Sequence, residues 1–262
     1  MELPIFQVDA FTRSVFSGNP AAVCPLEQWL GDETLQAIAA ENNLAETAFF
    51  VRNGDSFHLR WFTPVCEVDL CGHATLASAY VLFHELNEPR DTLRFVTRSG
   101  QLVVKREGDR LTMDFPSRPP ARVDVHPDLV SALGGNPIEI LGARDYLVLY
   151  KSADEIRALT PDMDALKRLD RFACIVTAPA SDCDFVSRFF APAQGIPEDP
   201  ATGSSHCTLT PYWAAKLSKT TLRARQLSPR GGEFFCRLVG DRVEISGHAV
   251  LFLRGRIEVK DP

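Results

Sequence analysis

The sequence predicts an α+β fold made of two pseudo-symmetric halves, each a curved and mostly antiparallel sheet around one central helix. Three observations lead to this prediction. Short landmarks recur about half a chain apart, much of the chain alternates apolar and polar residues with the period of β-strands, and one helix-like run, 73–87, is apolar on nearly every face. A helix that is apolar all round has to be buried. We therefore expect the sheet to wrap around it.

The repeated landmarks indicate an internal duplication. RWFTP at 60–64 returns as RFFAP at 188–192, and GDRLTM at 108–113 returns as GDRVEI at 240–245. Both second copies lie about half a chain after the first, in the same order. Such self-similarity is the sequence signature of a repeated structural unit.

The duplication sets the expected domain boundaries. We place an N-terminal half at 1–116 and a C-terminal half at 121–262, with a linker at 117–120 inside the Pro-rich stretch SRPPARVD. These boundaries allow the terminal strand to cross from one half to the other.

Strands are predicted where alternating or β-branched runs flank a Gly-Asp pair. The clearest runs are FHLRWF at 57–62, LVVKREGDRLTMDF at 102–115 and RVEISGHAVLFLRGRIEV at 242–259. Gly-Asp between two such runs is a signal for a short hairpin turn. The pattern therefore predicts hairpins near both GDR landmarks.

Helices are predicted to be fewer than strands. The first, 27–41, ends before the turn-prone ENN. The run 204–217 is the expected counterpart of 73–87, and Pro211 should disturb its first turns because proline lacks an N–H and clashes with the preceding turn. Shorter helices are expected at 126–133, 154–158 and 161–170.

Composition excludes several classes of protein. The chain has 262 residues, 45% hydrophobic and 24% charged, with a net charge of -6 and no long basic stretch. We therefore expect a globular protein with neither nucleic acid nor a membrane as partner. No apolar run is long enough to span a membrane, and the N-terminus lacks signal-peptide features. The seven cysteines are scattered without CxxC, which favours reduced thiols in the cytoplasm and no structural disulfide.

Two glycine-containing helix starts are candidate anion sites. Gly72 precedes the run 73–87, Gly203 precedes the run 204–217, and Ser204 is the first residue of that second run. A helix N-terminus offers unpaired N–H groups and partial positive charge, so it binds carboxylates readily. The alternative is that both glycines only fit tight turns and that Ser204 only caps its helix.

Glu46 is a candidate general acid or base. It lies in NNLAETAFF, directly before an apolar strand, where we expect it to be partly desolvated. Desolvation of a carboxyl group raises its pKa toward neutrality, which suits proton transfer. The alternative is an exposed glutamate at the start of a strand.

Metal and nucleotide sites are not indicated. His73 and His206, with the cysteines near them, show neither HExxH nor CxxC spacing, and no phosphate-loop or dinucleotide signature occurs. Cys71 and His73 are two residues apart and should not face each other along a helix, which argues against a cysteine nucleophile with a histidine base. We expect no metal.

Four motifs together resemble the phenazine-biosynthesis-like, or PhzF-like, isomerase family. They are VDAFTRSVFSGNPAAV at 8–23, NNLAETAFF at 42–50, FTPVCEVDLCGHATLA at 62–77 and EDPATGSSH at 198–206. The ordered set spans nearly the whole chain and is more specific than any single motif. The resemblance implies a fold similar to diaminopimelate epimerase, with a β-barrel-like sheet around a central helix in each half.

The resemblance also implies a function and a set of site residues. It implies a cytoplasmic, homodimeric isomerase that works without metal or organic cofactor on a small carboxylate, in a cleft between the halves. Glu46 would move a proton between substrate carbons, and His73 and Asp199 would position or polarise the substrate. Donors to the substrate carboxylate would come from Gly72, Gly203 and Ser204.

One departure keeps an alternative open. Cys71 directly precedes Gly72, where diaminopimelate epimerase-like proteins carry a thiol base, but the second half has Thr202 before Gly203. A thiol-dependent epimerase or racemase would thus lack its second cysteine. A non-catalytic protein that binds a small molecule is the third hypothesis.

Overall fold

The computed structural model describes residues 1–259, which form two compact units. Unit 1 contains Met1–Asp114 and the C-terminal segment from Ser246, and unit 2 contains Phe115–Ile245. The chain passes from unit 1 to unit 2 within β8 (Arg110–Pro116) and returns within β15 (Arg242–Gly247).

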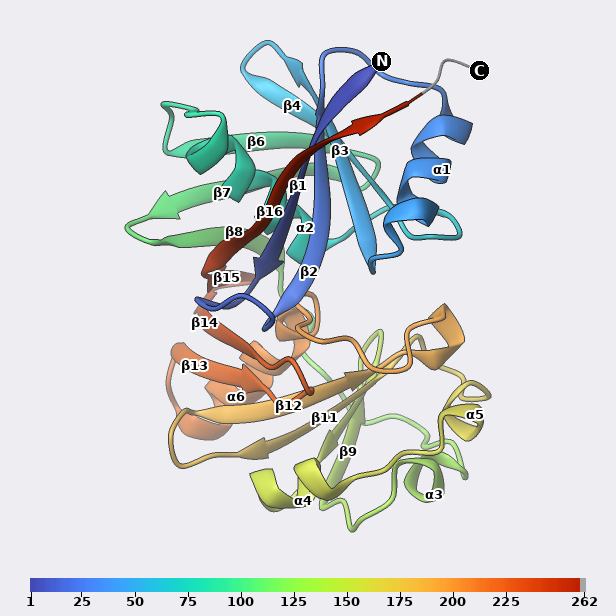
Figure 1. Ribbon diagram of the computed structural model, residues 1–262. Coiled ribbons are helices and arrows are strands. Elements are labelled where there is room, and N and C mark those ends of the chain that lie inside the picture. Colours follow the sequence, from blue (N-terminus) through green and yellow to red (C-terminus); the bar gives the residue numbers. More distant parts are fainter. Residues whose placement is uncertain (260–262) are drawn as a thin grey trace. The chain divides into compact units, whose positions relative to one another are not determined.

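Unit 1 is built on a mixed, mostly antiparallel sheet. Its strand order is β16-β1-β2-β3-β4-β6-β7-β8, with β5 paired to β4. The pairs β2–β3 and β4–β6 are parallel, and the other described pairs are antiparallel. Figure 1 shows β16 lying beside β1, so both ends of the chain belong to unit 1. The strand bounds are β1 Glu2–Ala10, β2 Asn19–Leu26, β3 Glu46–Asn53, β4 Ser56–Phe62, β5 Glu67–Val68, β6 Thr92–Thr97, β7 Gly100–Glu107 and β16 Ala249–Glu258.

The predicted central helix of unit 1 is present and buried. It runs as α2, Gly72–Tyr80, and continues as one π-helical segment, Val81–Glu85. Every residue from 73 to 79 is buried, and α2 contacts β1, β2, β3 and β16. The burial of this helix on all sides therefore explains why its residues are apolar on every face, as predicted. The other helix of this unit, α1, spans Asp32–Asn42 and begins later than predicted because the chain is still extended at Gly31.

Unit 2 has a sheet of order β14-β13-β12-β11-β10-β9. Its parallel pairs are β10–β11 and β12–β13, and antiparallel pairs separate them, as in unit 1. The landmark arginines Arg60 and Arg188 lie on β4 and β12, each of which lies between an antiparallel and a parallel neighbour, and β4 also pairs with the short β5. The internal duplication itself stays a prediction. The strand bounds are β9 Glu139–Gly142, β10 Tyr146–Leu149, β11 Cys174–Pro179, β12 Phe185–Phe190, β13 Thr221–Gln226 and β14 Gly232–Val239.

The helices of unit 2 differ from their predicted bounds mainly at their ends. The side chain of Asp162 accepts hydrogen bonds from the N–H groups of Asp164 and Ala165, which fixes the start of α5. Apart from a 3₁₀ turn at Pro192–Gln194, the bounds are α3 Leu129–Leu133, α4 Ala153–Ala158, α5 Met163–Leu166 and α6 His206–Leu217. In the described part of the chain, no helix has the length and apolar character needed to cross a membrane.

The helix α6 continues through Pro211. Proline has no N–H to donate to the carbonyl of Cys207, and that carbonyl accepts instead from the N–H of Arg118 at 2.8 Å. The expected disturbance is therefore limited to one replaced hydrogen bond. The helix begins at His206, two residues later than predicted, because 203–205 form a turn.

Candidate active site

Glu46 and His73 form the centre of the candidate site in unit 1. Glu46 is the first residue of β3, and His73 is the second residue of α2. Nε2 of His73 lies 3.0 Å from Oε2 of Glu46, and both side chains are buried. The packing of α2 against β2 and β3 brings them together. An imidazole N–H this close to a carboxylate is suited to holding or transferring a proton.

Cys71 also contacts His73, which corrects an expectation from the sequence. Its Sγ lies 3.5 Å from Nδ1 of His73, although the two residues are only two positions apart. The helical geometry assumed for this pair was wrong, because Cys71 is the N-cap of α2 and has an extended backbone. Helical geometry therefore does not set the direction of the Cys71 side chain, which points toward the ring of His73.

Asn19 is a further member of this site that the sequence analysis did not single out. It is the first residue of β2 and is fully buried. Its Nδ2 lies 3.2 Å from Nδ1 of His73. The only signal was its place inside the motif SGNP, where glycine and proline suggest a turn rather than a polar side chain aimed at a histidine.

Burial and charge set the protonation of this cluster. Burial raises the pKa of the Cys71 thiol to about 11, and the carboxylate of Glu46 adds to the rise. Burial disfavours the charged form of His73, but its acidic neighbours Cys71 and Glu46 outweigh that effect, so the pKa of His73 lies well above its ordinary value. Glu46 contributes to both shifts, because its carboxylate disfavours the thiolate of Cys71 and favours the charged form of His73.

The same three side chains could hold a metal ion. Donor atoms of Glu46, Cys71 and His73 all lie within 4.8 Å of one another. The expectation of no metal rested on spacing along the sequence, and spacing cannot reveal a convergence of β3 with the start of α2. In the structure, Nε2 of His73 and Oε2 of Glu46 already lie 3.0 Å apart, so the ring is paired with the carboxylate without an ion.

Asp199 lies in unit 2 and is held by its own network. It is buried, and the hydroxyl of Thr202 donates to its Oδ2. Nε2 of Gln226 donates to the Asp199 carbonyl at 2.6 Å and to the Thr202 hydroxyl at 3.1 Å. The N–H of Thr202 donates to Oε1 of Gln226 at 2.8 Å. Gln226 is at the end of β13, and nothing in the sequence indicated this role.

The predicted carboxylate donors lie at the starts of two buried helices, α2 and α6. Gly72 is the first residue of α2, and Gly203 and Ser204 precede α6 in a turn. Neither Gly72 nor Gly203 is among the glycines with positive φ, and Gly203 lies in the turn 203–205. Ser204 is not the cap either, because the N-cap of α6 is Ser205.

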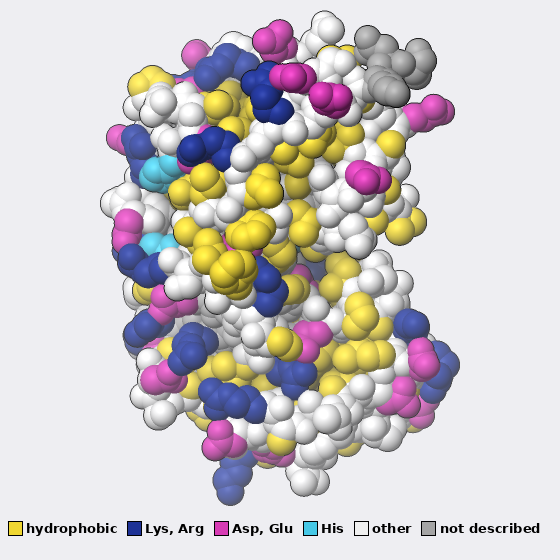
Figure 2. Space-filling model, viewed as in Figure 1, with side chains coloured by type: hydrophobic (Ala, Val, Ile, Leu, Met, Phe, Trp, Pro, Cys, Tyr) yellow, Lys and Arg dark blue, Asp and Glu magenta, His cyan; other side chains and the backbone are white. Residues whose placement is uncertain are grey.

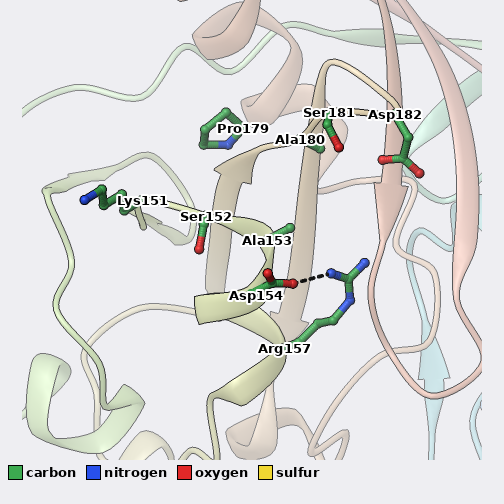
Figure 3. A pocket seen from close by; sticks show the side chains of 9 residues that line it. All are labelled: Lys151, Ser152, Ala153, Asp154, Arg157, Pro179, Ala180, Ser181 and Asp182. Atoms are coloured by element: carbon green, nitrogen blue, oxygen red, sulfur yellow. Dashed lines mark hydrogen bonds and ion pairs between the residues drawn. The ribbon is translucent and has the colours of Figure 1, made fainter.

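A separate surface hollow in unit 2 contains none of the predicted site residues. Its volume is about 610 Å³, and Figure 3 shows its lining side chains at the start of α4 and after β11. Asp154 and Arg157 pair across part of it at 3.0 Å, and Asp182 pairs with Arg225. The charged groups therefore largely satisfy one another in an exposed setting, and we assign no function to the hollow.

Comparison with known proteins shows similarity over the whole chain. A model of the phenazine biosynthesis-like protein family, PhzC-PhzF, matches residues 8–255. A Pseudomonas aeruginosa protein named an uncharacterised isomerase is 55% identical over 99% of this chain and 100% of its own length. The crystal structure of a PhzF-family phenazine biosynthesis protein from Enterococcus faecalis is 47% identical, with a TM-score of 0.97 over 99% of this chain and 100% of that one.

The comparisons also bear on the fold. A probable proline racemase from Agrobacterium radiobacter has a TM-score of 0.67 at 11% identity, covering 98% of this chain and 93% of that chain. At that identity the likeness concerns the fold alone. The predicted α+β, epimerase-like fold, the resemblance to PhzF-like proteins and the prediction of an isomerase of that type are confirmed.

Proposed function

Because the chain belongs to the phenazine biosynthesis-like family, we propose that it is a cofactor-independent isomerase that moves a proton between carbons of a small carboxylate substrate. The buried contact between Glu46 and His73 is the observation that carries this proposal. It places a carboxylate and a proton-bearing ring together in a site largely screened from water.

Glu46 is the proposed proton carrier. Its carboxylate takes a proton from one substrate carbon, and the electron pair of the broken C–H bond moves into the substrate's conjugated system. The protonated Glu46 then gives a proton to another carbon, either the one it took or one exchanged with solvent in between, so the reaction needs no net acid, base or redox partner. His73, in its charged form, stabilises the negative charge that develops in between.

The remaining predicted residues are proposed to bind the substrate. Gly72 has its N–H at the positive end of α2, where a carboxylate is stabilised. Asp199, Gly203 and Ser204 keep the roles that the motif resemblance implies, namely to position the substrate and to donate hydrogen bonds to its carboxylate. Single substitutions at these positions should raise KM more than they lower kcat.

The test is hydrogen exchange with solvent. The protein is incubated in D₂O with small cyclic and amino-acid-like carboxylates, and mass spectrometry detects deuterium in the carbon skeleton. On any substrate found, Glu46→Gln should lower the rate by about 10²–10⁴ because it keeps the shape but removes the ionisable group. Glu41→Gln makes the same change on the exposed side of α1 and should leave the rate unchanged. Full activity of Glu46→Gln would remove Glu46 from the mechanism.

One observation favours a second candidate, a thiol-dependent epimerase. Sγ of Cys71 lies 3.5 Å from a ring nitrogen of His73, so the ring could accept the thiol proton. The raised pKa of Cys71 opposes this. Cys71→Ala should retain turnover under the first proposal and lose it under the second, and iodoacetamide should inactivate the enzyme only under the second.

A further inference from the structure

We propose that Asn19 is a positioning residue that keeps the ring of His73 aimed at Glu46 in both ionisation states of that ring. This inference rests on the proposed function only in taking Glu46 and His73 as the acting pair. Its test reads the ring directly and needs no substrate, so its failure is distinguishable from a failure of the proposed isomerase reaction.

The ring of His73 is held from two sides. Nε2 faces Oε2 of Glu46 at 3.0 Å, and Nδ1 faces the side-chain amide of Asn19 at 3.2 Å. Asn19 is fully buried at the start of β2, and its backbone is fixed by pairing with Ala10 of β1. A ring anchored at one nitrogen can still rotate, whereas two anchors fix the direction of Nε2.

A carboxamide suits a ring whose charge changes. Neutral imidazole with its proton on Nε2 needs a donor at Nδ1, and the NH₂ group of Asn19 supplies it. Imidazolium carries a proton on Nδ1 and needs an acceptor, which the amide oxygen supplies after a half-turn of the amide. An aspartate in this place would only accept, and a leucine would do neither. Asparagine therefore serves both states without moving the ring.

The other titratable groups in contact with the ring of His73 are poorer partners for its Nδ1 than Asn19 is. Glu46 approaches from β3 and occupies Nε2. Cys71, at the start of α2, is 3.5 Å from Nδ1, but a thiol is a weak donor and a weak acceptor. The amide of Asn19 is the stronger partner for Nδ1 in either state.

The experiment follows the histidine rings by NMR. Protein labelled with ¹⁵N in histidine is recorded between pH 5.5 and 9, and loss of one set of signals in His73→Gln assigns the ring. In the unmutated protein the Nε2–H signal of His73 should stay sharp and slow to exchange at every pH. Asn19→Asp should keep that signal at low pH and lose it at high pH. Asn19→Leu should lose it throughout, with exchange faster by at least about tenfold.

Matched variants show whether the effect is specific. Asn53 contacts Nε2 of His58 at 2.8 Å in an exposed position, so Asn53→Leu should alter the His58 ring and leave that of His73 unchanged. Cys71→Ala should preserve the Nε2–H signal of His73. Melting temperature and the backbone amide spectrum show whether each variant is folded.

Three results would overturn the proposal. In the first, folded Asn19→Leu keeps the Nε2–H signal of His73 as in the unmutated protein. In the second, Asn19→Asp keeps it at high pH, and this variant decides the matter where Asn19→Leu does not fold. In the third, Cys71→Ala loses the signal as expected for Asn19→Leu, which would assign the anchoring of Nδ1 to the thiol.

Discussion

Glu46 illustrates what a single residue in a sequence can and cannot reveal. Its position before an apolar strand predicted desolvation, and the residue is indeed only 7% exposed. Its partner could not be predicted from spacing, because contact with His73 depends on how α2 packs against β2 and β3. Asn19 was missed for the same reason, since its side chain acts across the fold rather than along the chain.

Cys71 should be slow to react with alkylating agents. With a pKa of about 11, roughly one molecule in 10³–10⁴ carries a thiolate at pH 7.5, and the thiolate is the reactive form. Iodoacetamide at that pH should therefore modify the exposed Cys66 well before Cys71, as followed by peptide mass spectrometry. Modification of Cys71 at the rate of Cys66 would contradict the burial and charge described for it.

His73 should make the stability of the protein depend on pH. Its folded pKa lies above the unfolded value of about 6.5, so its contribution is fully present below pH 6.5 and is lost as pH rises through the folded value. The free energy of unfolding, measured in urea, should therefore differ more between the unmutated protein and His73→Gln at pH 6 than at pH 9.5. Each unit of pKa difference corresponds to about 1.4 kcal/mol. An equal difference at both values would contradict the raised pKa.

Among the elements, those with a strong local signal were predicted best. The run 73–87 became a helical segment over 72–85 that is buried at 73–79 and 81–83, because apolar residues on every face require burial. The Gly-Asp signal at 108–109 became the two-residue turn between β7 and β8. Helix starts were less accurate, since they depend on caps such as Asp162 whose bonds form only in three dimensions.

Gly18 directly precedes Asn19, the first residue of β2, and its backbone conformation sets how the chain enters that strand. Its φ is +66°, and an added Cβ would lie 2.2 Å from the carbonyl oxygen of Ala10. Gly18→Ala should therefore cost more than the about 1–3 kcal/mol of a left-handed backbone alone. Gly54→Ala is the matched control, because its φ is +57° with no atom within 4 Å. Urea unfolding should show the larger loss for Gly18→Ala, and equal losses would remove the steric argument.

At the scale of the molecule, the repeated landmarks predicted the class of fold better than the path of the chain. Both sheets alternate antiparallel pairs with two parallel pairs, which no local pattern could indicate. The boundaries of the compact units fall inside β8 and β15. A strand that changes unit has one continuous alternating pattern, so the sequence gives no signal at the crossing point.

The outer strand of unit 1 bears on the homodimer that the family resemblance implies. β16 is at the edge of its sheet, and Figure 2 shows apolar side chains gathered over β1 and β16. Phe252 on β16 is 43% exposed, and its ring contacts that of Phe16, which is 70% exposed, at 5.5 Å. Exposed apolar edge strands tend to pair with another chain, and two identical copies associate most simply about a two-fold axis. We propose that this edge meets a second copy.

Light scattering after size-exclusion chromatography tests that proposal. The unmutated protein should have a mass twice that of the 29.0 kDa chain, and Phe252→Glu should reduce it toward that of one chain, because a buried unpaired carboxylate is costly at an interface. Val239 is similarly exposed, at 46%, but lies on β14 of unit 2, so Val239→Glu should leave the mass unchanged. A single-chain mass for the unmutated protein would contradict the dimer, and a dimer that survives Phe252→Glu would place its interface elsewhere.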